Sequence, residues 1–274
     1  MSVVKKYLVK PGTRVHLSQW KTQETNIAGD EKELRKKCDK LNDELMQLHQ
    51  LLYAQHKYKI LVIFQAMDAG GKDGTIKHVF RGLNPQGVQV ESFKVPSTRE
   101  FDHDYLQRVH HKTPGKGEIV IFNRSHYEDV LVPMVHDLVP PRVWHRRYRH
   151  INEFERMLSD EETVILKFFL HVSEKEQKKR LVERIKDPRK AWKFNKQDIE
   201  ERQYWSKYMK AYQDAFRETS TKWAPWHIIP ADDNSVRNWI VSKIIVKELK
   251  KLNMSYPPMQ LSPTEIKKFC TMLA

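Results

Sequence analysis

The chain of 274 residues is 39% apolar and contains seven Trp, which is enough to bury one large core and excludes an intrinsically disordered protein. No stretch approaches the roughly 20 apolar residues that cross a bilayer, and the first residues lack the apolar core of a signal peptide. We therefore expect a cytoplasmic protein without a membrane partner. The net charge of +14, from 49 Lys and Arg against 35 Asp and Glu, predicts a polyanionic ligand: nucleic acid, acidic lipid, nucleotide or a phosphate polymer.

Apolar spacing predicts an irregular N-terminal arm over 1–30, one α/β domain over 31–252 and a C-terminal tail over 253–274 with one short amphipathic turn. In chain order, the domain is expected to contain a helix over 31–55, a strand over 59–64, a helix over 72–81, a strand over 88–95, a helix over 100–111, a strand over 118–122, a helix over 143–158, a strand over 163–172, charged helical sequence over 174–219 interrupted at 187–188, a strand over 226–230 and a helix over 235–252. Strands that alternate with helices predict a parallel sheet covered on both faces.

The segment AMDAGGK at 66–72 stands between a predicted strand and a predicted helix. Glycines in such a turn let backbone N–H groups point inward, the helix start adds partial positive charge, and the lysine reaches phosphate. The spacing fits a phosphate loop (Walker A), although Ala66 replaces the first glycine and Asp73 replaces the magnesium-binding hydroxyl. The predicted phosphate- and nucleotide-binding residues are Ala69, Gly70, Gly71, Lys72, Asp73, Gly74 and Thr75. An ordinary strand–turn–helix joint is the alternative.

Carboxylates at two strand ends predict a metal site. Asp68 lies inside the loop, and the strand at 118–122 is followed by the polar cluster NRSHYED at 123–129, which contains Glu128 and Asp129. Mg²⁺ is held by few carboxylates, so Asp68 and one of these two acids would be enough, with Mn²⁺ as an alternative cation. A turn-capping Asp68 and a surface-helix Asp129 are the competing interpretations.

Several cations are expected to face the same cleft. Arg124 directly follows a strand, and its planar guanidinium suits phosphate, with a structural salt bridge as the alternative. His126 is predicted to line the site without acting as a base, because ionised phosphate acceptors need none. Arg180 and Arg184 lie one helical turn apart, which predicts a lid over phosphates within 174–219, or else a solvated face. Lys193 adds a further cation or docks the lid.

Taken together, these segments resemble the polyphosphate kinase 2 family, over a span from about Tyr7 to Leu252. The resemblance rests on MDAGGKDGTI at 67–76, NPQG at 84–87, SFKVP at 92–96, FNRSHYEDV at 122–130, AWKF at 191–194 and APWHIIPADD at 224–233. It implies a P-loop kinase-like, three-layer α/β/α fold similar to that of thymidylate kinases, with a helical lid and Mg²⁺. The catalytic residues that it implies are Asp68, Lys72, Arg124 and Asp129, with Asp68 and Asp129 as metal ligands.

Two positions indicate a class within the family. Many members carry Asp where this chain has Asn123, and Asn where it has Glu128. The version found here looks like the third class, whose members phosphorylate both AMP and ADP, and Glu128 is expected on the acceptor side. A further departure is Gln107, where Trp is expected.

The resemblance implies inorganic polyphosphate and AMP, ADP and ATP as partners, with transfer in either direction. Because polyphosphate carries roughly one charge per phosphate, a basic track toward Lys72 is expected; its candidates are Lys77, Arg81, Arg108, His111 and Lys112. We also expect a homo-oligomer, with the N-terminal arm or the helix at 31–55 at its interface. An ATP-dependent nucleotide kinase of the same fold is the first alternative. A nucleic-acid-binding protein is less favoured, because no recognisable RNA or DNA module is present.

Overall fold

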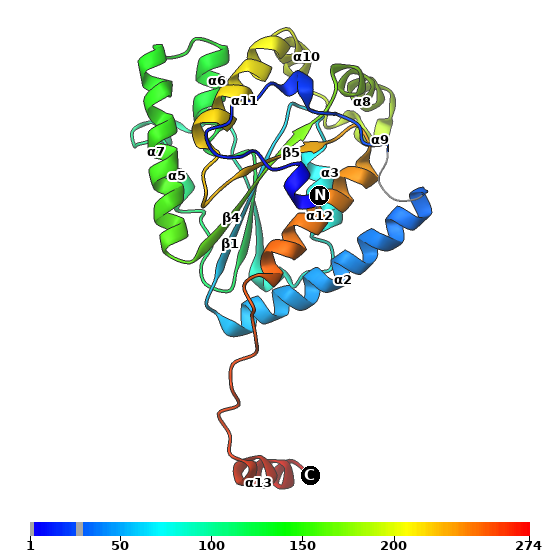
Figure 1. Cartoon of the computed structure of the whole chain (residues 1–274), viewed down its shortest axis with the longest axis vertical. Helices are drawn as coiled ribbons and strands as arrows, with labels where there is room; N and C mark the ends of the chain where they lie inside the picture. Colours follow the sequence, from blue (N-terminus) through cyan, green and yellow to red (C-terminus); the bar gives the residue numbers. More distant parts are fainter. Residues whose placement is uncertain (1–2, 26–29) are drawn as a thin grey trace.

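A five-stranded parallel sheet forms the centre of the structure, a computed structural model that describes residues 3–25 and 30–274 (Figure 1). The strands lie in the order β2-β3-β1-β4-β5, and every neighbouring pair is parallel. Their bounds are β1 Lys59–Gln65, β2 Val88–Ser92, β3 Ile119–Asn123, β4 Thr163–His171 and β5 Trp226–Pro230. The predicted α/β fold is confirmed, although β2 ends at Ser92 and not at residue 95.

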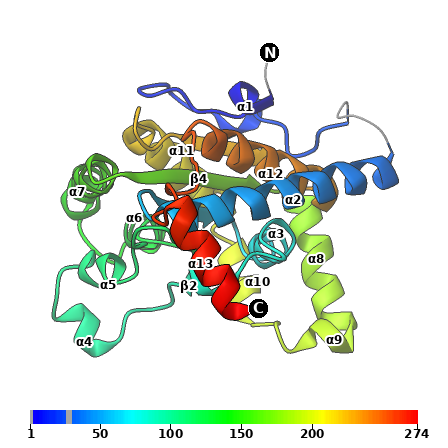
Figure 2. The same cartoon turned by 90° about the horizontal axis from the view of Figure 1, so that it is seen from below.

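Two groups of helices cover the two faces of the sheet (Figures 1 and 2). The first group is α2 Glu31–Gln55, α3 Lys72–Val79 and α12 Asn234–Lys250, and the second is α6 Glu128–Val135, α7 Pro141–Asp160 and α11 Trp205–Thr219. Burial from both sides explains the near-continuous apolar runs of β1 and β3. In the part of the chain that the structure describes, no helix is long and apolar enough to span a membrane.

The N-terminal segment lies against β5. Val9 N–H donates to the carbonyl of Trp226 (2.9 Å), and Ile228 N–H donates to the carbonyl of Tyr7 (2.9 Å). Both Tyr7 and Val9 are buried, so this segment packs on the body. The parts of the predicted arm at 1–2 and 26–29 lie outside the described residues.

The predicted helix over 100–111 is wrong, because two short helices, α4 (Thr98–Phe101) and α5 (Gln107–His110), replace it. Between them, the carboxylate of Asp104 accepts a hydrogen bond from Leu106 N–H at 2.9 Å. An aspartate that bonds the backbone two residues on competes with helical hydrogen bonds, so the chain turns there.

The segment at 174–219 is broken at more places than the predicted interruption. Its helices are α8 Glu174–Lys186, α9 Pro188–Ala191, α10 Gln197–Arg202 and α11. Asp187 accepts from Arg189 N–H (3.0 Å) before α9, and Asn195 accepts from Gln197 N–H (3.0 Å) before α10. Phe216 of α11 is fully buried, so α11, which falls within the predicted lid at 174–219, belongs to the core.

Two helices depart from the predicted pattern. α6 begins inside the polar cluster at 123–129, and Pro133 within it obscures its helical character in the sequence. The tail contains α13 (Pro263–Leu273), which has eleven residues where one short turn is expected. Ser262 and Glu265 form a capping box around Pro263, which explains where α13 starts.

A buried ion pair joins the sheet to the helices behind the segment at 123–129. The Lys167 ammonium on β4 donates to Glu155 Oε2 on α7 (2.6 Å), to the Thr219 carbonyl (2.7 Å) and to the Tyr127 hydroxyl (2.8 Å). Glu155 also bonds the ring of His126 (3.2 Å), and all five residues are fully buried. The prediction that His126 lines the site is therefore wrong: burial lowers the pKa of its ring, and the ring anchors the segment to α7.

We expect Lys167→Met to lower the free energy of unfolding by about 3 to 5 kcal/mol, because it leaves the Glu155 carboxylate buried without its cation. Urea denaturation at pH 7 measures the loss. The control Arg149→Ala removes an exposed ion pair with Glu153 on the same helix and should cost less than about 1 kcal/mol. Equal losses in the two variants would contradict a special role for the buried pair.

Candidate functional site

The phosphate loop joins β1 to α3 and contains a backbone conformation that suits glycine. Gly71 has a φ of 102°, and a Cβ there would clash with the guanidinium of Arg237. Lys72, at the first position of α3, folds back over the loop and donates to the Ala66 carbonyl (Nζ–O 2.8 Å). The loop backbone and the lysine therefore share one small region.

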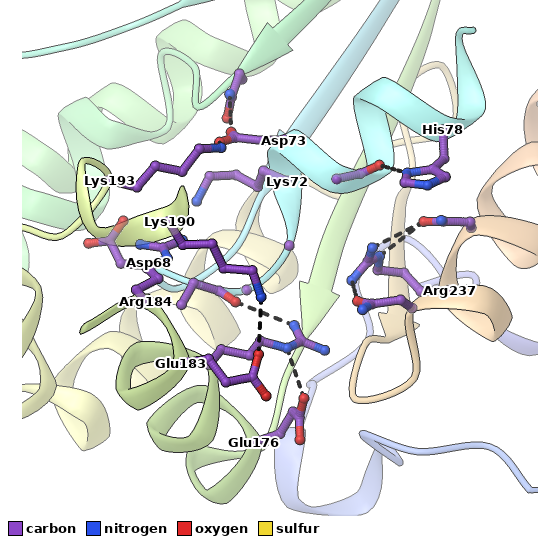
Figure 3. A pocket seen from close by; sticks show the side chains of 18 of the residues that line it. Asp68, Lys72, Asp73, His78, Glu176, Glu183, Arg184, Lys190, Lys193 and Arg237 are labelled. Carbon is purple, nitrogen blue, oxygen red and sulfur yellow. Dashed lines mark hydrogen bonds and ion pairs between the residues drawn. The ribbon is translucent and has the colours of Figure 1, made fainter. Parts of the chain in front are cut away.

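This region opens into a cavity of about 1370 Å³, part of which is drawn in Figure 3. The predicted site residues that line it are Asp68, Ala69, Gly70, Gly71, Lys72, Asp73, Gly74, Arg124, Arg180, Arg184 and Lys193. Thr75, Glu128 and Asp129 are absent from the lining. The Thr75 hydroxyl donates to the Gly71 carbonyl within α3 (3.0 Å) and is buried, so it does not replace the missing magnesium-binding hydroxyl.

An ion pair between Asp68 and Arg124 joins the ends of β1 and β3 (Oδ1–Nη2 2.5 Å). Arg124 has a φ of 63°, and its N–H donates to the Phe64 carbonyl (3.1 Å), which fixes the turn after β3. Burial would raise the pKa of Asp68, but the charges of Arg124 and Lys72 outweigh burial and hold this pKa below its ordinary value. Asp68 is therefore ionised and can attract a cation.

Glu128, at the start of α6, faces the same cluster. Its carboxylate lies 4.0 Å from Arg124 Nη1, and the other charges that act on it are those of Lys72 and Asp68. Burial raises its pKa, which the two cations oppose. The Glu128 carboxylate therefore interacts with the charged side chains of the phosphate loop.

Asp129 faces a different group of charges, because consecutive helical residues point about 100° apart. Arg108 approaches its carboxylate at 4.0 Å, and Arg147 Nη1 donates to its main-chain carbonyl (2.6 Å). Burial raises the pKa of Asp129 to about 6, and its Oδ2 has no hydrogen-bond partner in the described part of the chain. The geometry therefore brings Glu128, and not the predicted Asp129, toward Asp68.

Asp73 connects the loop to the segment that follows α8. Its carboxylate accepts hydrogen bonds from Asn123 Nδ2 (2.9 Å) and from Lys193 Nζ (3.1 Å). Lys193 follows α9, so this contact links the segment at 187–196 to the first turn of α3 (Figure 3). The residue that appeared anomalous in the loop thus holds two other polar side chains in place.

The two predicted lid arginines have different surroundings. Arg180 donates to the carbonyls of Ala231 (2.7 Å), Asp232 (2.9 Å) and Ala69 (3.3 Å), so it braces the phosphate loop against the end of β5. Arg184 bonds Asp198 (3.2 Å), and its charge helps to lower the pKa of Asp68. Of the two arginines, Arg184 is therefore the one whose charge acts on the loop carboxylate.

Comparison with known proteins shows the family of the chain. A sequence profile described as "Polyphosphate kinase 2 (PPK2)" matches residues 28–257. The chain belongs to the polyphosphate kinase 2 family. It is 53% identical to the AMP/ADP-polyphosphate phosphotransferase of Meiothermus ruber, over 96% of this chain and 99% of that protein. It is 44% identical to the ADP-polyphosphate phosphotransferase of Rhodopseudomonas palustris, over 92% of each.

A solved structure shares the fold of the whole chain. The crystal structure of polyphosphate kinase 2 from Arthrobacter aurescens TC1 superposes with a TM-score of 0.95 at 34% sequence identity, and the superposition covers 99% of this chain and 97% of that one. The predicted membership of the polyphosphate kinase 2 family is confirmed, and the fold is that of its kinases.

Arg237 is a cavity residue that the sequence analysis missed. It lies on α12 with 2% of its surface exposed and donates to the amide oxygens of Asn234 (2.7 Å) and Asn238 (3.1 Å), which carry no charge. Burial and the neighbouring Arg180 lower the pKa of Arg237 to about 9. A buried cation that has no carboxylate hydrogen-bond partner among the described residues, beside a phosphate loop, favours an anionic ligand. The sequence feature that could have indicated Arg237 is an arginine among the apolar residues of a predicted helix.

Most of the predicted basic track lies elsewhere. Of its five candidates, Arg81 lines the cavity and pairs with Asp39. Arg108 donates to the Lys94 carbonyl (2.9 Å), and Lys112 pairs with Glu91 (3.1 Å). Lys77, His111 and also Gln107, the position where Trp was expected, are outside the cavity lining.

We expect Gly71→Ala to lower the free energy of unfolding by at least about 2 kcal/mol, because it adds a strained φ and a contact with the Arg237 guanidinium. Gly74→Ala is the matched control in α3, since its Cβ would meet Arg237 Nη2 at an ordinary 3.6 Å. It should leave stability unchanged or raise it by up to about 1 kcal/mol. Denaturant titration of both variants measures the difference, and a Gly71→Ala protein as stable as its control would contradict the packing of Arg237 on the loop.

We expect Asp129→Asn to raise stability at pH 7 by about 1 to 3 kcal/mol. Burial raises the folded-state pKa of Asp129 from the ordinary 3.8 to about 6, so the wild-type protein loses stability as the pH rises from about 4 to 6. Asparagine does not titrate, and the two proteins should converge below about pH 4. Urea titrations between pH 4 and 8 measure this, and an Asn variant that is less stable across the range would show that the charged carboxylate is stabilising.

Proposed function

We propose that the chain transfers phosphate from inorganic polyphosphate to AMP and ADP, giving ADP and ATP, in a reversible reaction. The observation that carries the proposal is that one cavity combines Lys72 of the phosphate loop with Arg124 and Arg184 around the ionised Asp68. The names of the two relatives, with the Asn123 and Glu128 version of the polar cluster, favour adenine nucleotides as acceptors.

In the proposed reaction, the loop N–H groups and Lys72 bind the transferred phosphoryl group, and Arg124 and Arg184 neutralise the neighbouring phosphates. The bond between the terminal phosphorus of the polymer and its bridging oxygen breaks, and a new bond forms from that phosphorus to a terminal phosphate oxygen of the nucleotide. The bridging oxygen keeps its electron pair and becomes a terminal oxygen of the shortened polymer. No general base is needed, because the acceptor oxygen is already ionised.

We assign the divalent cation, Mg²⁺ or alternatively Mn²⁺, to Asp68 and Glu128, with Asn123 nearby, and not to Asp129. Among the described residues no group of three or more His, Cys, Asp and Glu forms a metal cluster, so phosphate oxygens and waters would complete the shell. The donor set fits, because Asp68 is ionised and the Glu128 carboxylate lies 4.0 Å from Arg124, the residue that pairs with Asp68. When bound, the cation would neutralise charge between donor and acceptor phosphates.

We further propose that α8–α10 act as the lid, and that the contact of Lys193 with Asp73 holds it near the loop. A short lid of charged helices excludes water from the transferred phosphoryl group when it closes. We place the protein in the cytoplasm, where its nucleotide substrates are found.

The assay incubates purified protein with Mg²⁺, long-chain polyphosphate and AMP, and resolves the nucleotides by chromatography. We expect ADP followed by ATP, and no product from Lys72→Met. Glu128→Gln should lower the rate at least about 100-fold, whereas Asp129→Asn should lower it less than about ten-fold, because Asp129 faces other charges.

Three results would change the proposal. ATP formed from ADP without product from AMP would remove the dual-acceptor class. Transfer from ATP to a nucleoside monophosphate, without transfer from polyphosphate, would favour the ordinary nucleotide kinase. A larger loss in Asp129→Asn than in Glu128→Gln, with both variants folded, would return the metal to Asp129.

A further inference from the structure

An exposed tryptophan lies among the charged residues of the cavity. The lining contains eleven Lys and Arg and seven Asp and Glu, which suit phosphate groups and a cation. Of the Phe, Tyr and Trp side chains in the described part of the chain, two line the cavity, Phe93 and Trp192. Phe93 is buried against the ring of Phe122, whereas Trp192 is 77% exposed. Polyphosphate has no apolar part that an indole could cover, so Trp192 indicates a different kind of ligand group.

The indole of Trp192 is held in one orientation. Trp192 directly follows α9, and its Nε1–H donates to the carbonyl of Arg189 in that helix (3.0 Å). Lys193 Nζ lies over the ring, 5.1 Å from its centre. Because the ring N–H already has a partner, a ligand meets the flat apolar surface of the indole. A flat aromatic ring in contact with water favours stacking on another flat ring.

Trp192 lies close to the residues that follow β3. Lys193 Nζ is 5.1 Å from the centre of the Trp192 ring and 3.1 Å from Asp73 Oδ2, so this carboxylate oxygen is at most 8.2 Å from the ring centre. The other oxygen of Asp73 accepts a hydrogen bond from Asn123 Nδ2 (2.9 Å), and Asn123 precedes Arg124. A nucleotide whose phosphate lies at Arg124 can therefore place its base against the indole.

The opposite side of Lys72 suits the polymer. Figure 3 shows Lys193 and Arg237 on opposite sides of Lys72. The residues of α12 that line the cavity beside Arg237 are Asn234, Ser235, Asn238 and Ser242. This set offers hydrogen bonds and a buried cation but no aromatic ring. In-line transfer requires donor and acceptor on opposite sides of the transferred phosphorus. With the polymer beside Arg237, the nucleotide approaches from the side of Trp192.

We propose that Trp192 stacks on the base of the acceptor nucleotide, an inference that rests on the proposed function of the cavity. The base covers indole surface that is otherwise in water, while the nucleotide phosphate reaches Arg124. Since inorganic phosphate and the free end of a polyphosphate have no flat apolar part, this contact favours a nucleotide as the acceptor.

Isothermal titration calorimetry in the absence of polyphosphate tests the stacking with two ligands, AMP and ribose 5-phosphate, which lacks the base. In the Trp192→Ala protein we expect the Kd of AMP to rise about 5- to 150-fold, as for a base that loses an aromatic stacking partner, and the Kd of ribose 5-phosphate to change less than about two-fold. Trp192→Phe keeps an aromatic ring and should recover most of the affinity for AMP.

Ile199→Ala is the matched control. Ile199 of α10 is 47% exposed and lies outside the cavity lining, so this variant removes an exposed apolar side chain of the proposed lid without touching the cavity. It should leave both Kd values unchanged. Circular dichroism should show the same thermal unfolding in all four proteins, because Trp192 and Ile199 are outside the core.

An unchanged Kd of AMP in the Trp192→Ala protein would overturn the inference. An equal loss of affinity for AMP and for ribose 5-phosphate would also overturn it, because Trp192 would then hold the proposed lid against the body and not contact the base. In both cases, transfer from polyphosphate in the chromatographic assay would still support the proposed function.

The reverse outcome separates the two proposals in the other direction. The expected loss of AMP affinity in a protein that transfers no phosphate from polyphosphate would contradict the proposed function and keep the contact of Trp192 with the base. A wild-type protein that does not bind AMP would overturn both.

Discussion

The ion pair between Lys167 and Glu155 is the interaction on which the site depends. It connects the inner strand β4 to α7 and, through the Thr219 carbonyl, to α11. The same two charges hold Tyr127 and His126, which immediately precede Glu128. Removing water from a lysine and a glutamate costs several kcal/mol unless their remaining hydrogen bonds are made, and here they are. The bonds of His126 and Tyr127 to this ion pair thereby hold the turn after β3, which includes the positive φ of Arg124.

The arginines of the site are paired with carboxylates, and a ligand could replace these carboxylates as their partners. Arg124 lies between Asp68 and Glu128, and Arg184 pairs with Asp198. Phosphate oxygens form the same bidentate contacts with guanidinium groups that carboxylates form. A bound polyanion could therefore replace the carboxylates as partner of each arginine without leaving a buried charge unpaired, while the released carboxylates become available to a cation.

Local sequence patterns were sufficient for the strands, the phosphate loop and the family, because each of these depends on neighbouring residues. The glycines and Lys72 of the loop are consecutive, and the buried strands read as apolar runs. Which way the Glu128 and Asp129 side chains point depends on where α6 begins. The sequence does not indicate this helix, because Pro133 lies within it. The role of Arg237 depends on α12 lying against the loop, a contact between residues more than 160 positions apart. The pattern of α12 shows only an arginine among apolar residues.

The distribution of charge explains why a strongly basic protein does not need a uniformly basic cavity. The lining contains eleven Lys and Arg and seven Asp and Glu, so only +4 of the net +14 lies there. The remaining excess acts at long range and attracts any polyanion, with little selectivity. Inside the cavity, each cation that has an acidic partner must exchange it for a phosphate. A ligand with one phosphate can satisfy few of these exchanges at once, whereas a polymer with many adjacent phosphates can satisfy several along one chain. Selectivity for a polyphosphate thus follows from the paired acids in the cavity as much as from the excess of basic residues.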